Sequence, residues 1–521
     1  MIKKILKYTK NLTLLALGLI GIYLFNLFFM KPYSIDHFLG KELVIGLVDS
    51  PEAMTYIGIF DKFNWLTGHN SNLSIPKKND RENSIEQYEK VIKTLYKYED
   101  SSLTEVQKNT KKIAIFDAEN NLKQVKEFPH HDYPLNQIGG IHLNTIEFLS
   151  DMHPIRNESE AEDFISRANL IKKVYEGVLA DLEDQASAGI FPPEFVYDHV
   201  IDQLSEFISY DYNEHPLYTQ FLRKVKELDV GQEKEKLFED QIKKAIDESV
   251  TPGFKILRDF MMRTKQYANK NHGIWSQPNG DEYYKLRIRS YTTTDYSPEE
   301  IHQMGLQEVD RISSRMREIL TELGYDENKT VGELMNELNE NPEFLYEDTP
   351  DRKEIVVNDY TEMMHEAIKV MEDYFHTMPK SEVIVKAVPE YSEQTAAGGY
   401  YQAPALDGSR PGVFYANLYD LKQTPKYSMR TLTYHEATPG HHHQIAHSLE
   451  NEELTLYRRF GYGTSAFSEG WALYAERLAL EVGLAENPYD ELGILQSEIF
   501  RAVRLVVDTG MHYKRWTREE A

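Results

Sequence analysis

Residues 434–444, with the sequence YHEATPGHHHQ, constrain this chain more than any other stretch. They place the carboxylate of Glu436 beside one imidazole, and three further imidazoles follow within eight positions. Neutral imidazole is a common zinc ligand, and a glutamate that directly follows a zinc-bound histidine can act as a general base on water. The usual motif is H-E-x-x-H, with both histidines on one helical face. Here Pro439 occupies the second ligand position, so the plain motif is absent.

A local irregularity in the helix would restore the pair of histidines. Pro439 has no N–H to bond to the carbonyl of His435, and Gly440 tolerates unusual dihedral angles. If two residues bulge out, His441 moves to the ligand position. On a straight helix His442 shares the face of His435 but lies about 10 Å further along. We therefore predict His435 and His441 as metal ligands, with His442 as the substitute for His441. The alternative is a surface histidine cluster that binds metal only by chance.

Composition sets the class of protein. At 521 residues the chain is long enough for two or three average domains or for one large helical body. The formal net charge of -26 argues against nucleic acid as a partner, because phosphate binding needs clustered Lys and Arg. Cysteine is absent, which excludes disulfides, cysteine nucleophiles and thiolate zinc sites.

The N-terminus predicts a membrane anchor over residues 1–33. Residues 11–30 are almost wholly apolar, and twenty helical residues span about the 30 Å of a bilayer core. The run is longer than the apolar part of a usual signal peptide, and no A-x-A cleavage site follows. Four lysines precede it and should stay in the cytoplasm, so the body lies outside the cell membrane. A cleaved signal peptide is the alternative. The lysines are Lys3, Lys4, Lys7 and Lys10.

The remaining residues, 34–521, read as a single helical, metallohydrolase-like domain. Apolar residues recur at helical spacing in residues 85–98 and 158–184. A helix start at Ser297 has a serine N-cap, proline at the first helical position and glutamate at the third. This helix should run to about Leu323.

Before the histidine motif, the pattern changes to short strands. Residues 383–388, 399–403 and 412–417 are candidate strands, and a turn at residues 407–412 joins the last two. The motif helix should begin near Ser428. We predict a small antiparallel sheet beside it, whose edge could bind an extended peptide. Alternatively, the strands only cover the core.

A third metal ligand is expected from elsewhere, because a catalytic zinc usually has three protein ligands and one open position. Glu469 lies on an apolar helix whose Ala472 and Ala475 would permit close packing against the motif helix. Glu476 is two turns further along and could hold a ligand histidine. The alternative for Glu469 is an exposed glutamate in a salt bridge.

These motifs carry a resemblance to a known family. Residues 468–472, SEGWA, look like the Asn-Glu-Gly-Phe-Ala ligand segment of gluzincin peptidases. Together with residues 435–437 and 439–442, they resemble the bacterial family called domain of unknown function 885. The resemblance implies a mainly α fold, with a large helical gluzincin-like body, and a zinc-dependent peptidase activity. Supporting segments are residues 50–52, 283–284, 297–300, 400–401, 407–412 and 507–512.

The family resemblance also bears on the end of the chain. Members continue beyond the segment that resembles residues 516–521, so we expect this chain to be truncated relative to them. Missing C-terminal helices would leave the cleft incomplete. This favours the alternative function, a membrane-tethered binding protein or an inactive pseudoenzyme.

The proposed chemistry is hydrolysis of a peptide amide bond with Zn²⁺ as cofactor. His435, His441 and Glu469 would hold the zinc ion, and Glu436 would transfer a proton from water to the leaving amine. Hydrolysis of esters or other amides is a further option that the sequence does not separate from peptide cleavage.

The developing oxyanion needs a second hydrogen-bond donor. Tyr401, His512 and Tyr513 are candidates for it, and each could instead be an ordinary core or surface residue. Arg410 could bind a substrate carboxylate or stabilise its own turn. The sequence leaves the oligomeric state open.

Overall fold

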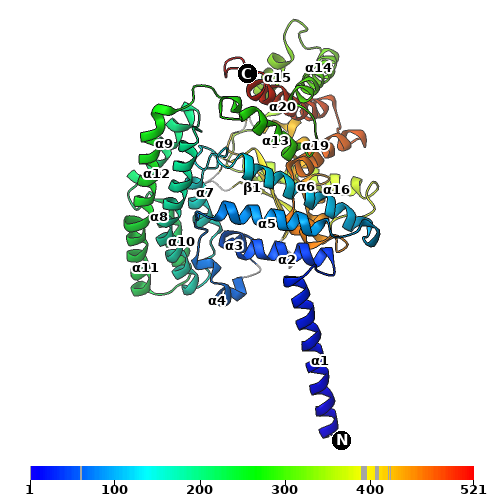
Figure 1. Cartoon of the computed structure of the whole chain (residues 1–521). Helices are drawn as coiled ribbons and strands as arrows, with labels where there is room; N and C mark the ends of the chain where they lie inside the picture. The colour runs from blue at the N-terminus through cyan, green and yellow to red at the C-terminus, as the bar shows by residue number, and fades with distance from the viewer. Residues whose placement is uncertain are drawn as a thin grey trace. The chain divides into compact units, whose positions relative to one another are not determined.

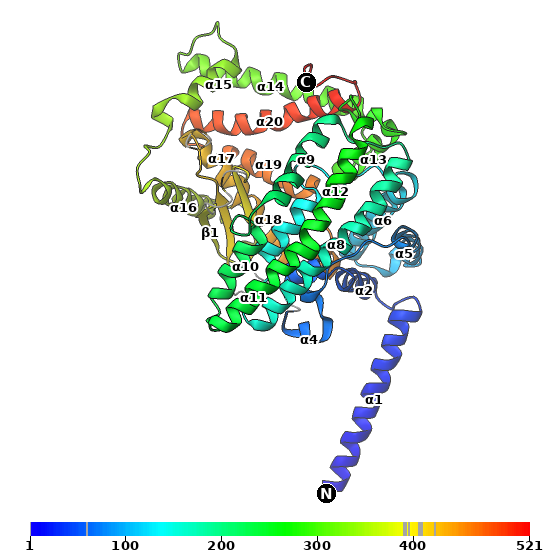
Figure 2. The same cartoon turned by 90° about the vertical axis from the view of Figure 1, so that its left-hand side faces the viewer.

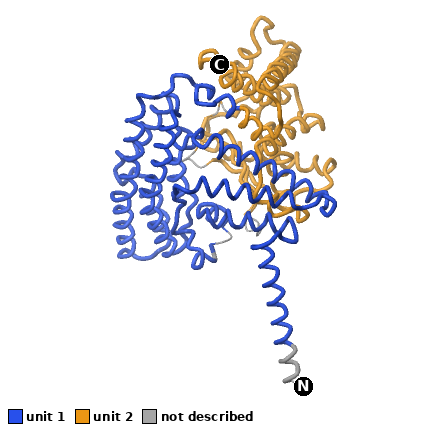
Figure 3. The backbone as a smooth tube through the Cα atoms, in the orientation of Figure 1, with its two compact units in different colours: residues 1–284 blue, residues 285–521 orange. Residues whose placement is uncertain are grey.

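Helices make up most of the chain, which confirms the prediction of a mainly α protein (Figure 1). The computed structural model describes residues 2–58, 61–388, 393, 396–404, 410–420, 422 and 424–521. Its contacts divide the chain into two compact parts, unit 1 (residues 1–284) and unit 2 (residues 285–521), which Figure 3 shows in two colours. The boundary lies within residues 34–521, whose assignment to one domain stays a prediction.

Unit 1 is built from helices, and the last of them crosses the unit boundary. They are α1 (Ile2–Phe29), α2 (Ile35–Val48), α3 (Pro51–Ile57), α4 (Asn64–Thr67), α5 (Asp80–Leu95), α6 (Glu105–Glu127), α7 (Ile141–Glu147), α8 (Glu158–Ser187), α9 (Glu194–Ser209), α10 (Pro216–Lys226), α11 (Gln232–Ala245), α12 (Thr251–Thr264) and α13 (Gly280–Thr292).

The first helix, α1, projects from the rest of unit 1 (Figures 1 and 2). Its segment Thr9–Phe29 has a mean hydropathy of 2.2 and is long and apolar enough to cross a membrane. Only 6% of this window is buried inside the protein. An apolar helix so little covered by protein supports attachment to a membrane or a signal-peptide role.

The core of unit 1 lies between α8 and α12. Phe164, Ile171 and Val178 are seven positions apart in α8 and therefore lie on one face of the helix. They join Leu257 and Met261 of α12 in one buried apolar cluster. The predicted helical spacing in residues 158–184 thus corresponds to a core helix.

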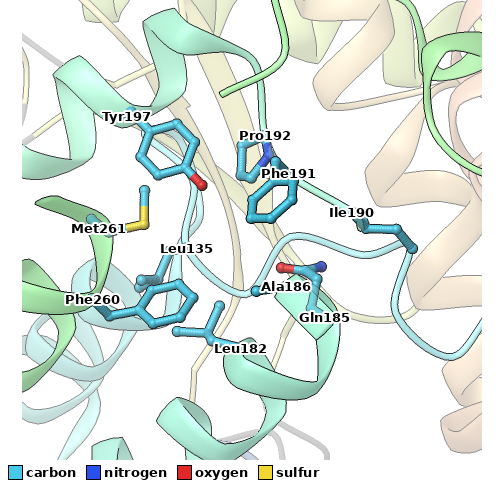
Figure 4. Close-up of a pocket in the computed structure, with 10 residues that line it drawn as sticks. All are labelled: Leu135, Leu182, Gln185, Ala186, Ile190, Phe191, Pro192, Tyr197, Phe260 and Met261. Carbon is cyan, nitrogen blue, oxygen red and sulfur yellow. The ribbon is translucent and has the colours of Figure 1, made fainter. Parts of the chain in front are cut away.

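A small cavity in this core is shown in Figure 4. Its volume of ≈ 10 Å³ leaves room for about one water molecule. A cavity of this size cannot hold a substrate, so a functional site must be sought elsewhere. Its walls are formed by Leu135, Leu182, Gln185, Ala186, Ile190, Phe191, Pro192, Tyr197, Phe260 and Met261.

A buried arginine ties several segments of unit 1 together. Arg167 of α8 is 0% exposed, and its Nη2 donates to Thr55 Oγ1 at 2.7 Å and to His69 O at 3.0 Å. Its Nη1 donates to His153 Nδ1 at 2.8 Å, and Nε2 of that ring donates to Glu160 O at 3.0 Å. His153 is therefore neutral. Its burial, together with the positive charge of Arg167, lowers its pKa to about 3.

This buried histidine should make the protein sensitive to acid. A histidine whose folded pKa lies below its unfolded value of about 6.5 stabilises the fold above that pH and loses this contribution as the pH falls. Between pH 8 and pH 5 the loss for His153 is on the order of 2 kcal/mol. Urea unfolding of His153→Gln should show a pH dependence weaker by this amount, whereas the exposed His199→Gln should behave like the native chain. An unchanged pH dependence in His153→Gln would contradict the assignment.

Unit 2 combines helices with a small sheet. Its elements are α14 (Pro298–Glu322), α15 (Val331–Glu340), α16 (Arg352–Met371), β1 (Val383–Ala387), β2 (Gly399–Gln402), β3 (Gly412–Ala416), α17 (Lys426–Glu436), α18 (His441–Glu450), α19 (Ser465–Glu481) and α20 (Pro488–His512).

The predicted start of α14 is confirmed. Ser297 Oγ accepts from the backbone N–H of Glu300 at 3.2 Å, and the carboxylate of Glu300 accepts from Ser297 N at 2.8 Å. The helix ends at Glu322, next to the predicted end. It packs closely on α20, since a Cβ atom on Gly305 would lie 2.8 Å from Leu505 Cβ. This close approach needs glycine at position 305.

The three predicted strands are present, but the sheet is mixed and not antiparallel throughout. The strand order is β1-β3-β2, with β2 antiparallel and β1 parallel to β3. The prediction is wrong for the β1–β3 pair because the chain reverses direction at each connection. The first and third strands then run the same way, and β3 lies between the other two. The predicted turn at residues 407–412 falls partly on residues 405–409, which are outside the described residues.

Helices α16 and α17 share a core with the sheet. Phe414 of β3 is fully buried, and its ring makes an edge contact with Tyr360 of α16 at a centroid distance of 5.2 Å. Val356 of α16 and Met429 of α17 belong to the same apolar cluster. The motif helix α17 is thus packed against the sheet through this cluster.

Candidate metal centre

The histidine motif breaks its helix completely. We expected a two-residue bulge, but α17 ends at Glu436 and α18 begins at His441. The four residues between them leave the helical conformation, with ψ angles of -116° at Ala437 and -129° at Gly440. Pro439 has no N–H for the carbonyl of residue 435, which explains why the first helix stops here.

Gly440 allows the chain to turn back against the end of α17. A Cβ atom at this position would lie 1.9 Å from His435 O and 2.3 Å from Tyr434 O, so a larger residue does not fit. From the other side, Trp471 of α19 donates its indole N–H to Pro439 O at 2.8 Å. The break is therefore held by close packing on one side and by a hydrogen bond on the other.

The break brings the predicted ligands together. The rings of His435 and His441 are nearly perpendicular, with centroids 4.7 Å apart. Glu469 of α19 lies opposite both rings: its Oε2 is 3.5 Å from His435 Nε2, and its Oε1 is 3.5 Å from His441 Nε2. One ligand atom from each of the three residues lies within 4.8 Å of the others. Buried Ala472 and Ala475 occur on the same helix, as expected for close packing.

These distances fit a zinc ion. With ligand bonds of about 2.0–2.2 Å, two ligands of a tetrahedral zinc ion are about 3.3 Å apart. The two observed nitrogen–oxygen distances of 3.5 Å are close to that value. The side chain of Glu469 is 58% exposed, whereas both histidines are buried, so solvent reaches the site from the glutamate side. Zinc binding itself stays a prediction.

The charges around the triad also favour a cation. Although burial alone would lower it, hydrogen bonds to Glu469 and Glu476 raise the pKa of His435 to about 9. Burial and the positive charge of His435 lower the pKa of His441 to about 4. Without a metal, His435 therefore carries one positive charge and His441 is neutral. A divalent ion would take the place of the His435 proton between the two rings and the carboxylates.

Glu436, the predicted base, faces this cluster. It is 6% exposed, and its Oε2 has no hydrogen-bond partner among the described residues. Burial raises the pKa of Glu436 to about 7, and its carboxyl group interacts electrostatically with His435 and Glu469. A buried carboxylate with a near-neutral pKa has the properties of a general base.

Glu476 lies where we expected it, behind the first ligand. Its Oε1 is 2.7 Å from His435 Nδ1, and the side chain is 1% exposed. A carboxylate only accepts hydrogen bonds, so His435 Nδ1 donates and Nε2 is the atom directed at Glu469.

Arg501 of α20 is a site residue that the sequence did not predict. Its Nη2 lies 3.4 Å from Glu476 Oε1 and 3.1 Å from His435 Nδ1, and its Nη1 donates to Ser497 O at 3.0 Å. Nothing in the local pattern of α20 distinguishes this arginine from its neighbours. Only the packing of α20 on α17 and α19 reveals its place beside the ligands.

His442 lies outside the group formed by His435, His441 and Glu469, and both of its ring nitrogens have other partners. Its Nε2 is 3.1 Å from Ser381 O, and a carbonyl oxygen can only accept, so Nε2 carries the proton. Its Nδ1 therefore accepts a hydrogen bond from the hydroxyl of Tyr401 at 2.9 Å. A Cβ atom on Gly412 would lie 2.7 Å from Tyr401 Oη, which leaves the pair little freedom to move.

The two neighbouring histidines should therefore respond differently to substitution. We expect His441→Gln to lose the bound zinc, because it removes one of three ligands, and His442→Gln to retain one zinc ion per chain. Metal content after dialysis, measured by plasma emission spectroscopy, checks both. Loss of zinc from His442→Gln together with its retention in His441→Gln would restore the substitute assignment.

The remaining residues predicted for the site are His512, Tyr513, Arg410 and Tyr401. His512 is the last residue of α20, eleven residues after Arg501, and thus about 16 Å further along the helix axis. Tyr513 follows it at the C-cap. Arg410 is exposed, and its positive charge opposes the rise in the pKa of Tyr401 that burial causes. Tyr401 and Arg410 are thus within electrostatic range of each other, whereas His512 lies far along α20 from the metal centre.

A cleft of ≈ 550 Å³ adjoins the metal centre within unit 2. His435 and Glu476 form part of its wall, together with Ser497, Phe500 and Arg501 of α20. Gly398, which directly precedes the edge strand β2, also lines it. The volume lies in the range of clefts that bind small molecules.

Comparison with known proteins gives a family and a fold. A family model described as "Bacterial protein of unknown function (DUF885)" matches residues 51–521. No curated protein sequence matches the chain. These findings agree with the family resemblance of the histidine and glutamate motifs.

Two solved structures share the fold. A crystal structure described as a "putative lipoprotein" from Colwellia psychrerythraea has 33% sequence identity and a TM-score of 0.81, and covers 93% of this chain and 84% of that chain. A "putative lipoprotein of unknown function" from Shewanella oneidensis has 17% identity and a TM-score of 0.70, with 94% and 85% covered. The descriptions of both similar proteins call them lipoproteins.

Proposed function

Because this chain belongs to DUF885, a bacterial family of unknown function, we propose its function from its own geometry. We infer that it is a zinc-dependent hydrolase of the gluzincin type, which cleaves amide bonds of peptides. The observation that carries the proposal is the convergence of His435, His441 and Glu469 within 4.8 Å, beside the buried carboxylate of Glu436.

Each residue of the centre has a role in this proposal. His435, His441 and Glu469 would hold the zinc ion, and Glu476 would fix the ring of His435 through Nδ1. When bound, zinc would supply a Lewis acid for the water and for the scissile carbonyl. Glu436 would take a proton from the attacking water and return it to the leaving amine.

Arg501 would offset part of the negative charge of the carboxylates at the centre. Glu436, Glu469 and Glu476 bring three carboxylates to the centre, and Arg501 is positioned against Glu476 at 3.4 Å. With neutral histidines, three ionised carboxylates and one arginine leave two negative charges, which a divalent cation neutralises. This balance supports a metal ion of charge two over a monovalent one.

A peptide substrate is supported by the cleft and by the sheet edge. An extended peptide can pair with an exposed edge strand through its main chain, and β2 is an edge strand of the β1-β3-β2 sheet. The cleft beside it offers the partly exposed ring of Phe500 for an apolar side chain and Ser497 for a hydrogen bond. Such a mixture suits a peptide better than a purely apolar ligand.

The N-terminal helix supports a location at the membrane. We propose that α1 spans the cytoplasmic membrane with the lysines before it inside, so that the catalytic body lies on the outer side. The apolar segment Thr9–Phe29 and its low burial inside the protein support this topology.

Peptide cleavage with and without a chelator tests the function. The purified full chain should cleave members of a peptide library, lose this activity after chelation and recover it when about one equivalent of zinc is added. Cleavage that persists in a chain shown to be free of metal would overturn the zinc assignment. A zinc-loaded chain that cleaves no peptide, ester or amide would favour a binding protein.

A further inference from the structure

A short segment of unit 1 exposes three large apolar side chains. Phe63 is 53% exposed, and in α4 the exposed fractions are 81% for Trp65 and 71% for Leu66. Single exposed apolar residues are common on protein surfaces, but three within four positions form a local patch. We call Phe63, Trp65 and Leu66 the aromatic knuckle.

The backbone of the aromatic knuckle is firmly held. Asn64 donates from its side chain to Asp163 Oδ2 at 2.8 Å and accepts from the backbone N–H of Asn70 at 3.0 Å. Gly68 adopts a left-handed conformation with φ of 60° and donates to Asn64 O at 2.7 Å, which ends the helix. The apolar side chains are therefore presented outward by a braced turn.

The aromatic knuckle lies at the same end of unit 1 as the exit of α1. Figures 1 and 2, which differ by a quarter turn, both place α4 at this end. The junction of α1 with the body is well defined, since Asn26 Oδ1 accepts from Tyr33 N at 2.9 Å and Tyr98 donates to Pro32 O at 2.8 Å. A membrane crossed by α1 would therefore face the knuckle.

We propose that the aromatic knuckle is a second membrane contact, inserted into the interfacial layer of the bilayer that α1 spans. The inference rests on the proposed span of α1. Tryptophan favours this layer because its ring is apolar while its N–H needs a polar partner. A helix alone leaves the body free to tilt and rotate. A second contact at the side of the helix restricts both motions and holds unit 1 against the lipid surface.

Tryptophan fluorescence offers a direct test. The chain contains four tryptophans, Trp65, Trp275, Trp471 and Trp516, and α1 contains none. The full chain is reconstituted into phosphatidylcholine vesicles with lipids brominated close to the headgroup, which quench only fluorophores at that depth. We expect native emission to be partly quenched, Trp65→Phe to lose the quenched component, and the control Trp275→Phe to keep it.

Flotation with the vesicles separates the two ways of failing. A chain that floats with the vesicles but shows the same quenching in Trp65→Phe as in the native protein overturns the knuckle contact and leaves the span of α1 intact. Native protein that floats with the vesicles but shows no quenching also overturns the knuckle contact and leaves the span of α1 intact. A full chain that stays outside the vesicles overturns both the span and the contact. Because Trp65 is 81% exposed, its replacement should not disturb folding, which circular dichroism checks.

Discussion

Replacing Glu436 with glutamine should strongly slow hydrolysis while leaving the zinc content unchanged. Glutamine keeps the size of the side chain and its place at the end of α17, but it cannot take a proton at neutral pH. A positioned general base typically contributes a factor of about 10²–10⁴, so we expect kcat to fall by that factor with little change in KM. Steady-state kinetics on the best peptide of the library, with metal analysis of the same samples, measures both effects.

Glu452→Gln is the matched control for this substitution. Glu452 is exposed and lies in the segment after α18, so the same chemical change there should leave kcat and zinc content as in the native chain. Native-like turnover by Glu436→Gln would remove Glu436 from the mechanism. Loss of zinc from Glu436→Gln would instead indicate that this carboxylate is a ligand.

Gly440→Ala should destroy the metal centre although it changes no ligand side chain. The added Cβ atom would lie 1.9 Å from His435 O and 2.3 Å from Tyr434 O, both of which belong to a buried helix end. Backbone on both sides has to move, which costs about 3 kcal/mol of stability. It also displaces His441 relative to His435, so zinc affinity and hydrolysis should fall together.

Gly332→Ala serves as the control for Gly440→Ala. Gly332 lies in α15, and a Cβ atom there would have nothing within 4 Å. Because alanine favours helix, this variant should be as stable as the native chain or more stable by up to about 1 kcal/mol. Urea unfolding and zinc titration compare the two variants. A Gly440→Ala chain with native zinc affinity would mean that the break does not depend on glycine.

Local features of the fold were predictable from sequence. The capping residues Ser297 and Glu300 act within one turn of helix, so their hydrogen bonds depend on residues three positions apart. The interruption at Pro439 is equally local, because the missing N–H ends α17 regardless of how the helix packs. The extent of the interruption was underestimated, because the backbone that surrounds Gly440 is set by contacts with α19 and with the end of α17.

The sheet shows where local patterns stop being informative. Three short strands could be located from their β-branched and aromatic residues. Their order could not, because the pattern of a strand says which of its faces is buried and nothing about its neighbours. The parallel β1–β3 pair depends on β3 lying between β1 and β2.

The chemical groups of the candidate site, and their spacing along each helix, could be predicted from the sequence alone, since rise and turn per residue are constant in a helix. His435 and Glu436 are adjacent in sequence, Pro439 predicts the interruption that allows His441 to approach, and Glu469 was expected because a catalytic zinc usually has a third protein ligand. The tertiary structure decided which groups meet: Arg501 joins the centre from α20, His442 turns to Tyr401, and His512 lies apart. The physical reason is that distances between helices are set by side-chain packing among segments remote in sequence.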